Sequence, residues 1–217
     1  MLEIFQKGGP LMWLLLLLSV LALGAIFDRV LYFHRCSIST ADFLRGIATL
    51  IRRGDIGEAI QEAALTPGPI ARVVHAVLQH NGADATELRL VGEEAGRLEI
   101  PDLERRLPLL SGIAYLAPLF GLLGTMLGLM QSFSSISTQG LYTTTAEIGG
   151  GVFQSLATSI AGLAVAIPAF MAYAYLGSRV DGFLSDMERA AIETSHLLLE
   201  RRDREDSNTS NANEKKS

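Results

Sequence analysis

Three long runs of uncharged, largely apolar residues alternate with charged segments along the 217-residue chain. The runs cover residues 9–27, 107–133 and 148–178. A helix needs about 20 apolar residues to cross a bilayer, and each run meets that length. We therefore expect an all-α, polytopic membrane protein with three transmembrane helices, the second and third extended into a cytoplasmic helical region.

The segments between the runs are predicted from charge, proline and glycine. Within 28–106 the pattern indicates two short amphipathic helices that break at Gly54-Asp55, a stop and restart in TPGPIARVV, and a helix over 85–106. Thr86 is the expected cap of that last helix, and Pro101 is expected near a break. The full set of expected segments is an N-terminal stretch 1–8, a charged helical region 28–106, a loop 134–147, a helix 179–206 and a disordered tail 207–217.

The first apolar run could also be a cleaved signal peptide, because Ala22-Leu23-Gly24 resembles a cleavage site. Two features favour an uncleaved span instead. Glu3 cancels the charge of Lys7, and the apolar run is longer than a signal peptide usually has.

The basic residues predict the orientation. Segment 28–106 and the part after residue 178 hold 17 of the 18 Lys and Arg residues, whereas the 134–147 loop holds none. The positive-inside rule therefore places the N-terminus and that loop in the periplasm, and the 28–106 region and the C-terminus in the cytoplasm.

Small and hydroxylated residues form a stripe on each of the last two spans, because they recur at steps of three and four. The stripes contain Gly121, Gly124, Thr125, Gly128 and Ser132 on the second span, and Gly151, Ser155, Thr158, Ser159, Gly162, Ala166 and Ala169 on the third. Such stripes either pack helices closely or face a cavity into which a second protein supplies a titrating group. Periodicity alone favours the packing interpretation.

Candidate chemistry is sparse. Neither of the last two spans has an ionisable side chain at mid-membrane depth; Glu147 stands at the outer mouth of the third. One cysteine and four scattered histidines do not predict a metal site, and we expect no cofactor. Gly149-Gly150-Gly151 lacks the lysine of a P-loop, and no nucleophile–base pair indicates an enzyme. The net charge of −5 argues against nucleic acid as a partner.

Two long segments of the sequence resemble those of a known protein family. The segments LERRLPLLSGIAYLAPLFGLLGTMLGLMQSF (103–133) and GGVFQSLATSIAGLAVAIPAFMAYAYL (150–176) resemble the ExbB/TolQ/MotA family of proton-channel subunits. The opening at 7–33 and DMERAA at 186–191 agree with it. The chain is more similar to ExbB and TolQ than to MotA, because MotA has four spans.

The resemblance implies a ring, usually pentameric, in a bacterial inner membrane, with the second and third helices around a pore. It implies a single-span partner of the ExbD/TolR type, whose transmembrane aspartate takes up and releases protons, and it allows for a TonB/TolA-like protein as a further partner. Proton flow would drive work on the cell envelope. The alternative is a non-conducting membrane scaffold of the same fold.

By resemblance, Thr125 matches the family's pore threonine, and Thr158-Ser159 match its Thr-Thr or Ala-Thr pair. Gln154 stands where ExbB and TolQ often have glutamate, and Glu147, two turns earlier on the same face, is a hypothetical substitute. The expected proton pathway therefore contains Thr125, Thr158, Ser159, Gln154, Ser155 and Glu147. The expected helix-packing residues are Gly121, Gly124, Gly128, Gly151 and Gly162.

Overall fold

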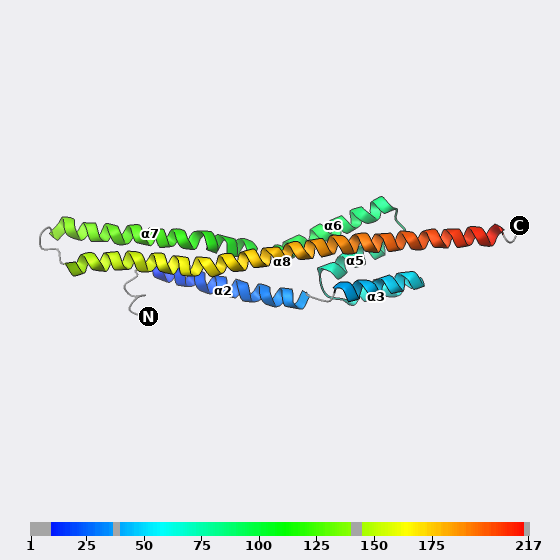
Figure 1. Ribbon diagram of the computed structural model, residues 1–217, viewed down its shortest axis with the longest axis horizontal. Coiled ribbons are helices and arrows are strands. Elements are labelled where there is room, and N and C mark those ends of the chain that lie inside the picture. Colours follow the sequence, from blue (N-terminus) through cyan, green and yellow to red (C-terminus); the bar gives the residue numbers. More distant parts are fainter. Residues whose placement is uncertain (1–9, 37–39, 140–144, 215–217) are drawn as a thin grey trace. The chain divides into compact units, whose positions relative to one another are not determined.

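The computed structural model describes the backbone at residues 10–36, 40–139 and 145–214, and it is helical with short connections throughout those ranges (Figure 1). The described residues contain no strand, which confirms the all-α prediction. The helices are α2 (Pro10–Cys36), α3 (Thr40–Arg53), α4 (Ile56–Leu65), α5 (Pro69–Gln79), α6 (Ala85–Glu104), α7 (Leu107–Gln139) and α8 (Thr145–Glu214).

Three of these helices are long and apolar enough to cross a membrane. The qualifying segments are Pro10–His34 in α2, Leu107–Ser137 in α7 and Gly149–Arg204, which contains the apolar stretch of α8. The prediction of three spans is therefore confirmed by length and composition. The chain divides into two compact units, a membrane unit of Met1–Val30 and Arg106–Gly177, and a charged unit of Leu31–Arg105 and Ser178–Ser217.

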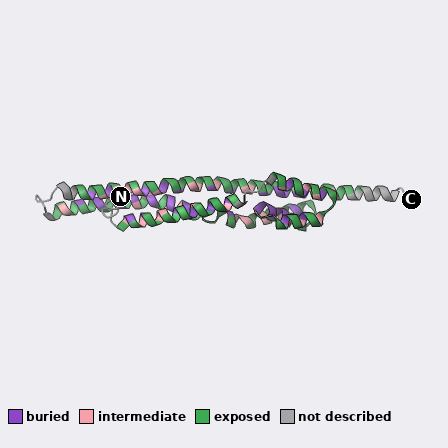
Figure 2. Ribbon diagram, turned by 90° about the horizontal axis from the view of Figure 1, so that it is seen from below, coloured by how far each residue is buried: buried purple, intermediate pink, exposed green. Residues whose placement is uncertain are grey.

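The core of the membrane unit combines small side chains with a few large ones. Leu15 of α2 packs with Ala117 of α7 and Ala166 of α8, and Phe120 and Val165 lie against this cluster. Many other large apolar side chains are exposed, so exposed positions alternate with buried ones along the helices (Figure 2). Lipid tails are as apolar as these exposed side chains, so their exposure fits helix packing in a bilayer.

The charged unit is held together by aliphatic side chains from α3, α5, α6 and the later part of α8. Helix α5 packs against both α4 and α6. Representative fully buried side chains are Ile47 and Ile51 of α3, Val74 and Leu78 of α5, Leu88 of α6, and Met187 and Leu198 of α8. Phe33 stacks on Phe183 with ring centroids 5.6 Å apart. Arg72 of α5 forms a two-pronged ion pair with Glu99 of α6, with Nε 2.7 Å from Oε1 and Nη2 on Oε2.

The breaks between helices follow backbone chemistry. Gly54 has φ +94° between α3 and α4, and Pro69 starts α5 directly after Gly68, which has φ +125°. Both are conformations that glycine adopts without the clash of a Cβ. The expected break at Gly54-Asp55 and the restart within TPGPIARVV are confirmed. The second span begins after another break, at Arg106, whose φ is +75°.

Two details differ from expectation. Asp84, not Thr86, caps α6, because its carboxylate accepts a hydrogen bond from the Glu87 amide at 2.7 Å. The expected cap was wrong, and Thr86 lies within the first turn. Pro101 lies inside α6 and close to the break that follows Glu104, as expected. Helix α8 also runs past the expected boundary at 206 and ends at Glu214.

Candidate functional site

Helices α7 and α8 approach closely along the two small-residue stripes of the membrane unit. A Cβ added to Gly124 would lie 2.6 Å from Thr158 Cβ, and one added to Gly162 would lie 2.6 Å from the Ala117 carbonyl oxygen. Real Cβ atoms essentially never come so close, so only glycine permits this separation. The five glycines that we expect at packing positions all lie in this interface: Gly121, Gly124, Gly128, Gly151 and Gly162.

A pair of hydroxyl groups bridges the two helices at the middle of the interface. Thr125 Oγ1 lies 2.7 Å from Ser159 Oγ, and it lies 3.2 Å from the carbonyl oxygens of both Gly121 and Ser155. Ser159 Oγ is 3.3 Å from the same Gly121 carbonyl. Thr125 has a single proton to donate, so its three possible acceptors are alternatives. The result is a half-buried cluster of four oxygens, called here the hydroxyl node.

Two other predicted pathway residues lie inside the packed interface. Ser155 is 2% exposed and Thr158 is 1% exposed. Ser155 donates to the Val152 carbonyl at 2.7 Å, and the Thr158 hydroxyl is 3.0 Å from the Gln154 carbonyl and 2.9 Å from that of Ser155. Both hydroxyls are therefore satisfied within their own helix and are covered by packing.

The remaining two predicted pathway residues lie on the same helix, nearer its start. Gln154 is partly exposed one turn before the hydroxyl node. Glu147 belongs to the first turns of α8, and its side chain lies outside the described residues. The structure thus brings Thr125 and Ser159 together and leaves Gln154 at partial exposure.

Charge is confined to the ends of the spans. From residue 107 to 178 the sequence contains only one acidic residue, Glu147, and no Lys, Arg or His. At the other end of the membrane unit, Asp28 Oδ2 lies 3.6 Å from Arg106 Nε and 4.0 Å from Arg29 Nε. The hydroxyl node can therefore donate and accept hydrogen bonds, but it cannot itself hold a proton as a charge at neutral pH.

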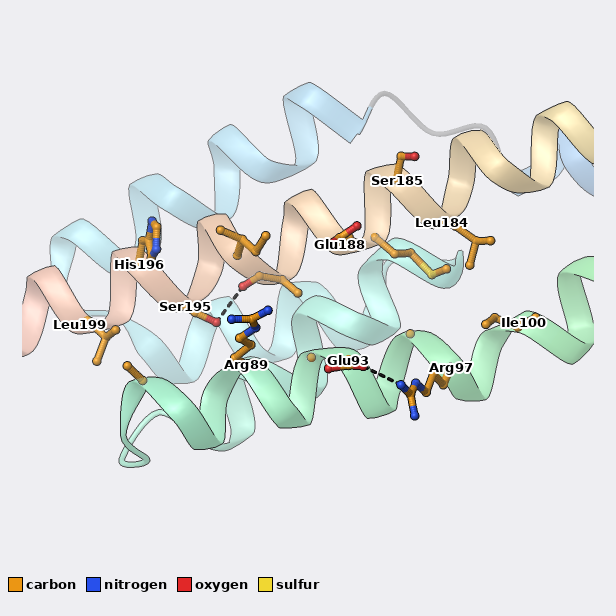
Figure 3. Close-up of a pocket in the computed structure, with 16 residues that line it drawn as sticks. Arg89, Glu93, Arg97, Ile100, Leu184, Ser185, Glu188, Ser195, His196 and Leu199 are labelled. Atoms are coloured by element: carbon orange, nitrogen blue, oxygen red, sulfur yellow. Dashed lines mark hydrogen bonds and ion pairs between the residues drawn. The ribbon is translucent and has the colours of Figure 1, made fainter.

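A groove lies in the charged unit, between α6 and the later part of α8 (Figure 3). It has a volume of about 740 Å³. Glycine again explains its shape: a Cβ at Gly92 would lie 2.8 Å from Ala191 Cβ, whereas a Cβ at Gly96 would meet nothing within 4 Å. This groove was not predicted from the sequence, although the spacing of Gly92 and Gly96 on one helical face could have indicated it.

The groove has a charged rim but no candidate reactive centre among the described residues. Glu93 and Arg97 pair with each other at 2.7 Å along one face of α6, as solvated charges four residues apart commonly do (Figure 3). No group of three His, Cys, Asp or Glu residues that could hold a metal ion occurs in the described part of the chain. The hydroxyl node is therefore the stronger candidate site.

One family model and several known proteins match this chain. A family model described as the MotA/TolQ/ExbB proton channel family matches residues 66–189, a range that includes Thr125 and Ser159. The chain is 37% identical over 169 residues to the putative biopolymer transport protein ExbB-like 3 of Synechocystis sp., covering 75% of this chain and 78% of that one.

Two further relatives agree with that match. The putative biopolymer transport protein ExbB homolog of Methanothermobacter thermautotrophicus is 26% identical over 188 residues, covering 86% of this chain and 66% of its own length. The Tol-Pal system protein TolQ of Haemophilus influenzae is 38% identical over 100 residues, covering 46% of this chain and 43% of its own length.

Proposed function

From the premise that this chain belongs to the MotA/TolQ/ExbB proton channel family, we propose that it is the ring-forming subunit of a proton-driven motor. In this proposal it works with a single-span partner of the ExbD/TolR type and converts proton motive force into mechanical work on the cell envelope. The family is one of proton channels, so we propose no enzymatic reaction for this chain.

One observation carries the proposal. The hydroxyl node offers hydrogen bonds between two spans that lack any ionisable side chain at mid-membrane depth. A proton path through a bilayer normally needs an ionisable side chain at that depth. The hydroxyls of this chain can hydrogen-bond such a group but cannot replace it, so a second protein has to supply the titrating carboxylate.

The chemistry of the assembled site follows from the donors present. A carboxylate on the partner's span accepts hydrogen bonds from Thr125 and Ser159 while it is charged. When it takes up a proton it becomes neutral, and it then needs fewer donors and crosses the apolar environment at lower cost. Each proton that crosses delivers about 2.3 kcal/mol per 100 mV of membrane potential.

The outer part of the pathway needs a separate account, because Gln154 cannot carry a charge. We propose that Glu147 provides the acidic group that Gln154 lacks, since it lies seven residues earlier and therefore on the same helical face. Glu147→Gln should then lower proton flux and change its pH dependence, measured in proteoliposomes that contain the whole complex. Unchanged flux with an unchanged pH profile would remove Glu147 from the pathway.

The assembly and its orientation are part of the proposal. The ring is a homopentamer in a bacterial inner membrane, with α7 and α8 around the pore, the N-terminus in the periplasm and the C-terminus in the cytoplasm. The distribution of basic residues supports that orientation. A TonB- or TolA-like protein would pass the motion on to the outer membrane.

A non-conducting scaffold of the same fold is the second candidate, and the burial of Ser155 and Thr158 in close helix packing favours it. The two functions respond differently to Ser159→Ala. In a conducting subunit this change should abolish function while the complex still assembles. In a scaffold it should do little, and only bulky replacements at the packing glycines should cause damage.

The proposal is tested by purifying the chain from its native membrane with the proteins bound to it and determining the mass of the intact complex. A ring of this chain that encloses a partner with a transmembrane aspartate is the expected result. A homo-oligomer that never binds a partner would leave the pore without a titrating group, and the scaffold function would replace the proposed one.

A further inference from the structure

The contact between Thr158 and Gly124 lies directly beside the hydroxyl node. A Cβ on Gly124 would lie 2.4 Å from Thr158 Oγ1, 2.6 Å from its Cβ and 3.1 Å from its Cγ2. The Thr158 side chain therefore fills the space that Gly124 leaves open. We infer that Thr158 is a positioning residue, which sets the separation of α7 and α8 and so keeps Thr125 and Ser159 in hydrogen-bond contact.

Burial and bonding distinguish Thr158 from the residues of the node. Its side chain is 1% exposed, and its hydroxyl bonds only carbonyls of its own helix, those of Gln154 and Ser155. A proton held in this way is not offered to a second protein. Helix α7 contacts the Thr158 side chain through van der Waals packing and not through a hydrogen bond. Thr158 therefore contributes to this contact by its shape.

Adjacent residues couple this packing to the node. Gly124 precedes Thr125 and Thr158 precedes Ser159, so the two contacts join the same two turns of helix. The Thr125–Ser159 oxygens are 2.7 Å apart, and a hydroxyl pair ceases to be a good hydrogen bond beyond about 3.0 Å. An increase of a few tenths of an ångström in helix separation at Thr158 would therefore lengthen and weaken the bond at the node.

The inference rests on the proposed function, and shape and hydroxyl can be tested separately. Thr158→Val keeps the branched shape without the hydroxyl, and Thr158→Ala removes the branch. In the purified complex, reconstituted into proteoliposomes, the conservative variant Thr158→Val should retain proton flux, whereas Thr158→Ala should lower it about tenfold, the equivalent of one hydrogen bond. Equal losses in both variants would show that the hydroxyl acts, and Thr158→Ala at wild-type flux would show that the shape does not matter.

An exchange of volume provides a second test. Gly124→Ala alone should separate the helices, because Thr158 Cβ is fixed to the backbone and no side-chain rotation relieves the 2.6 Å contact. Adding Thr158→Gly removes every atom of that contact, so the double variant should regain flux relative to Gly124→Ala. A double variant with less flux than Gly124→Ala would contradict the inference.

A distance measurement separates this inference from the proposed function. In a Cys36→Ser background, Thr125→Cys and Ser159→Cys report the node geometry through the yield of the disulfide between them, with or without conduction. Thr158→Val should leave the yield unchanged, and Thr158→Ala should lower it. If wild type does not conduct, the proposed function fails but the positioning inference is still decided; equal yields in both variants would overturn it.

Discussion

Replacing Thr125 by valine removes one oxygen from the hydroxyl node while leaving the branched shape of the side chain in place. The change eliminates the 2.7 Å contact with Ser159 Oγ and the 3.2 Å contacts with the carbonyls of Gly121 and Ser155. Both carbonyls belong to residues within helices, so neither depends on Thr125 alone for a partner. The cost to helix packing should therefore be modest.

The two expected magnitudes differ enough to be separated. A hydroxyl makes at most one donated bond and in this node one accepted bond, and side-chain hydrogen bonds in membranes average about 0.6 kcal/mol. Thr125→Val should thus weaken the α7–α8 contact by about 1 kcal/mol. A hydrogen bond to a charged carboxylate is worth about 1.5–3 kcal/mol, which corresponds to a loss in proton flux of about 10- to 150-fold.

The assay measures both quantities on the same preparations. Proton flux is recorded in proteoliposomes under an imposed potential, and assembly and thermal stability are recorded for the purified complex in detergent. Thr125→Ser is the matched control, because it keeps Oγ1 and loses only a methyl group. We expect Thr125→Ser to retain proton flux, and Thr125→Val to lose flux by the factor given above while the complex still assembles.

Two results would refute this reasoning. If Thr125→Ser lost as much flux as Thr125→Val, the methyl group and its packing would matter rather than the hydroxyl. If Thr125→Val conducted normally, the node would not lie on the proton path, and the close approach of α7 and α8 would be a packing feature alone.

Three further predictions concern the charged unit. Asp84→Ala should destabilise the first turn of α6 by about 1 kcal/mol, because it removes the cap on the Glu87 amide, whereas Thr86→Ala should not; amide hydrogen exchange in that turn compares them. Gly92→Val should clash with Ala191 Cβ and so lower the midpoint of thermal unfolding, which circular dichroism measures. The hydrogen bond to Glu99 raises the pKa of Arg72 above its ordinary value. The contribution of this ion pair to stability is therefore fully present at any pH below the ordinary pKa, and it is lost only as the pH rises through the raised pKa. Arg72→Ala should therefore lower that midpoint by the same amount at pH 6 as at pH 9, and a much smaller effect at pH 9 would contradict this account.

Hydrophobic patterning predicted the large features well, because each depends on local chemistry. Three charge-free runs are sufficient for three membrane-length helices, and Gly54 and Pro69 mark breaks through their own backbone preferences. Glycines at steps of three and four indicate close packing of the last two spans from the sequence alone.

The details that differ depend on contacts that the pattern does not contain. Thr158 and Ser159 are about 100° apart on a helix, so both fit one broad stripe, and only the position of α7 decides which is covered and which reaches Thr125. Asp84 and Thr86 are both good capping residues by type, and the turn before α6 decides between them. The continuation of α8 to Glu214 has no apolar period to indicate it.

Proton flux through the purified complex, compared with flux through this chain alone, tests the central claim most directly. The claim is that this chain supplies hydroxyls and a partner supplies the titrating carboxylate. The account predicts flux only when the single-span partner is present, and its loss when the partner's aspartate is changed to asparagine. Equal flux through the chain alone would contradict it, because the path would then need a proton-carrying group that residues 107–178 do not contain beyond Glu147.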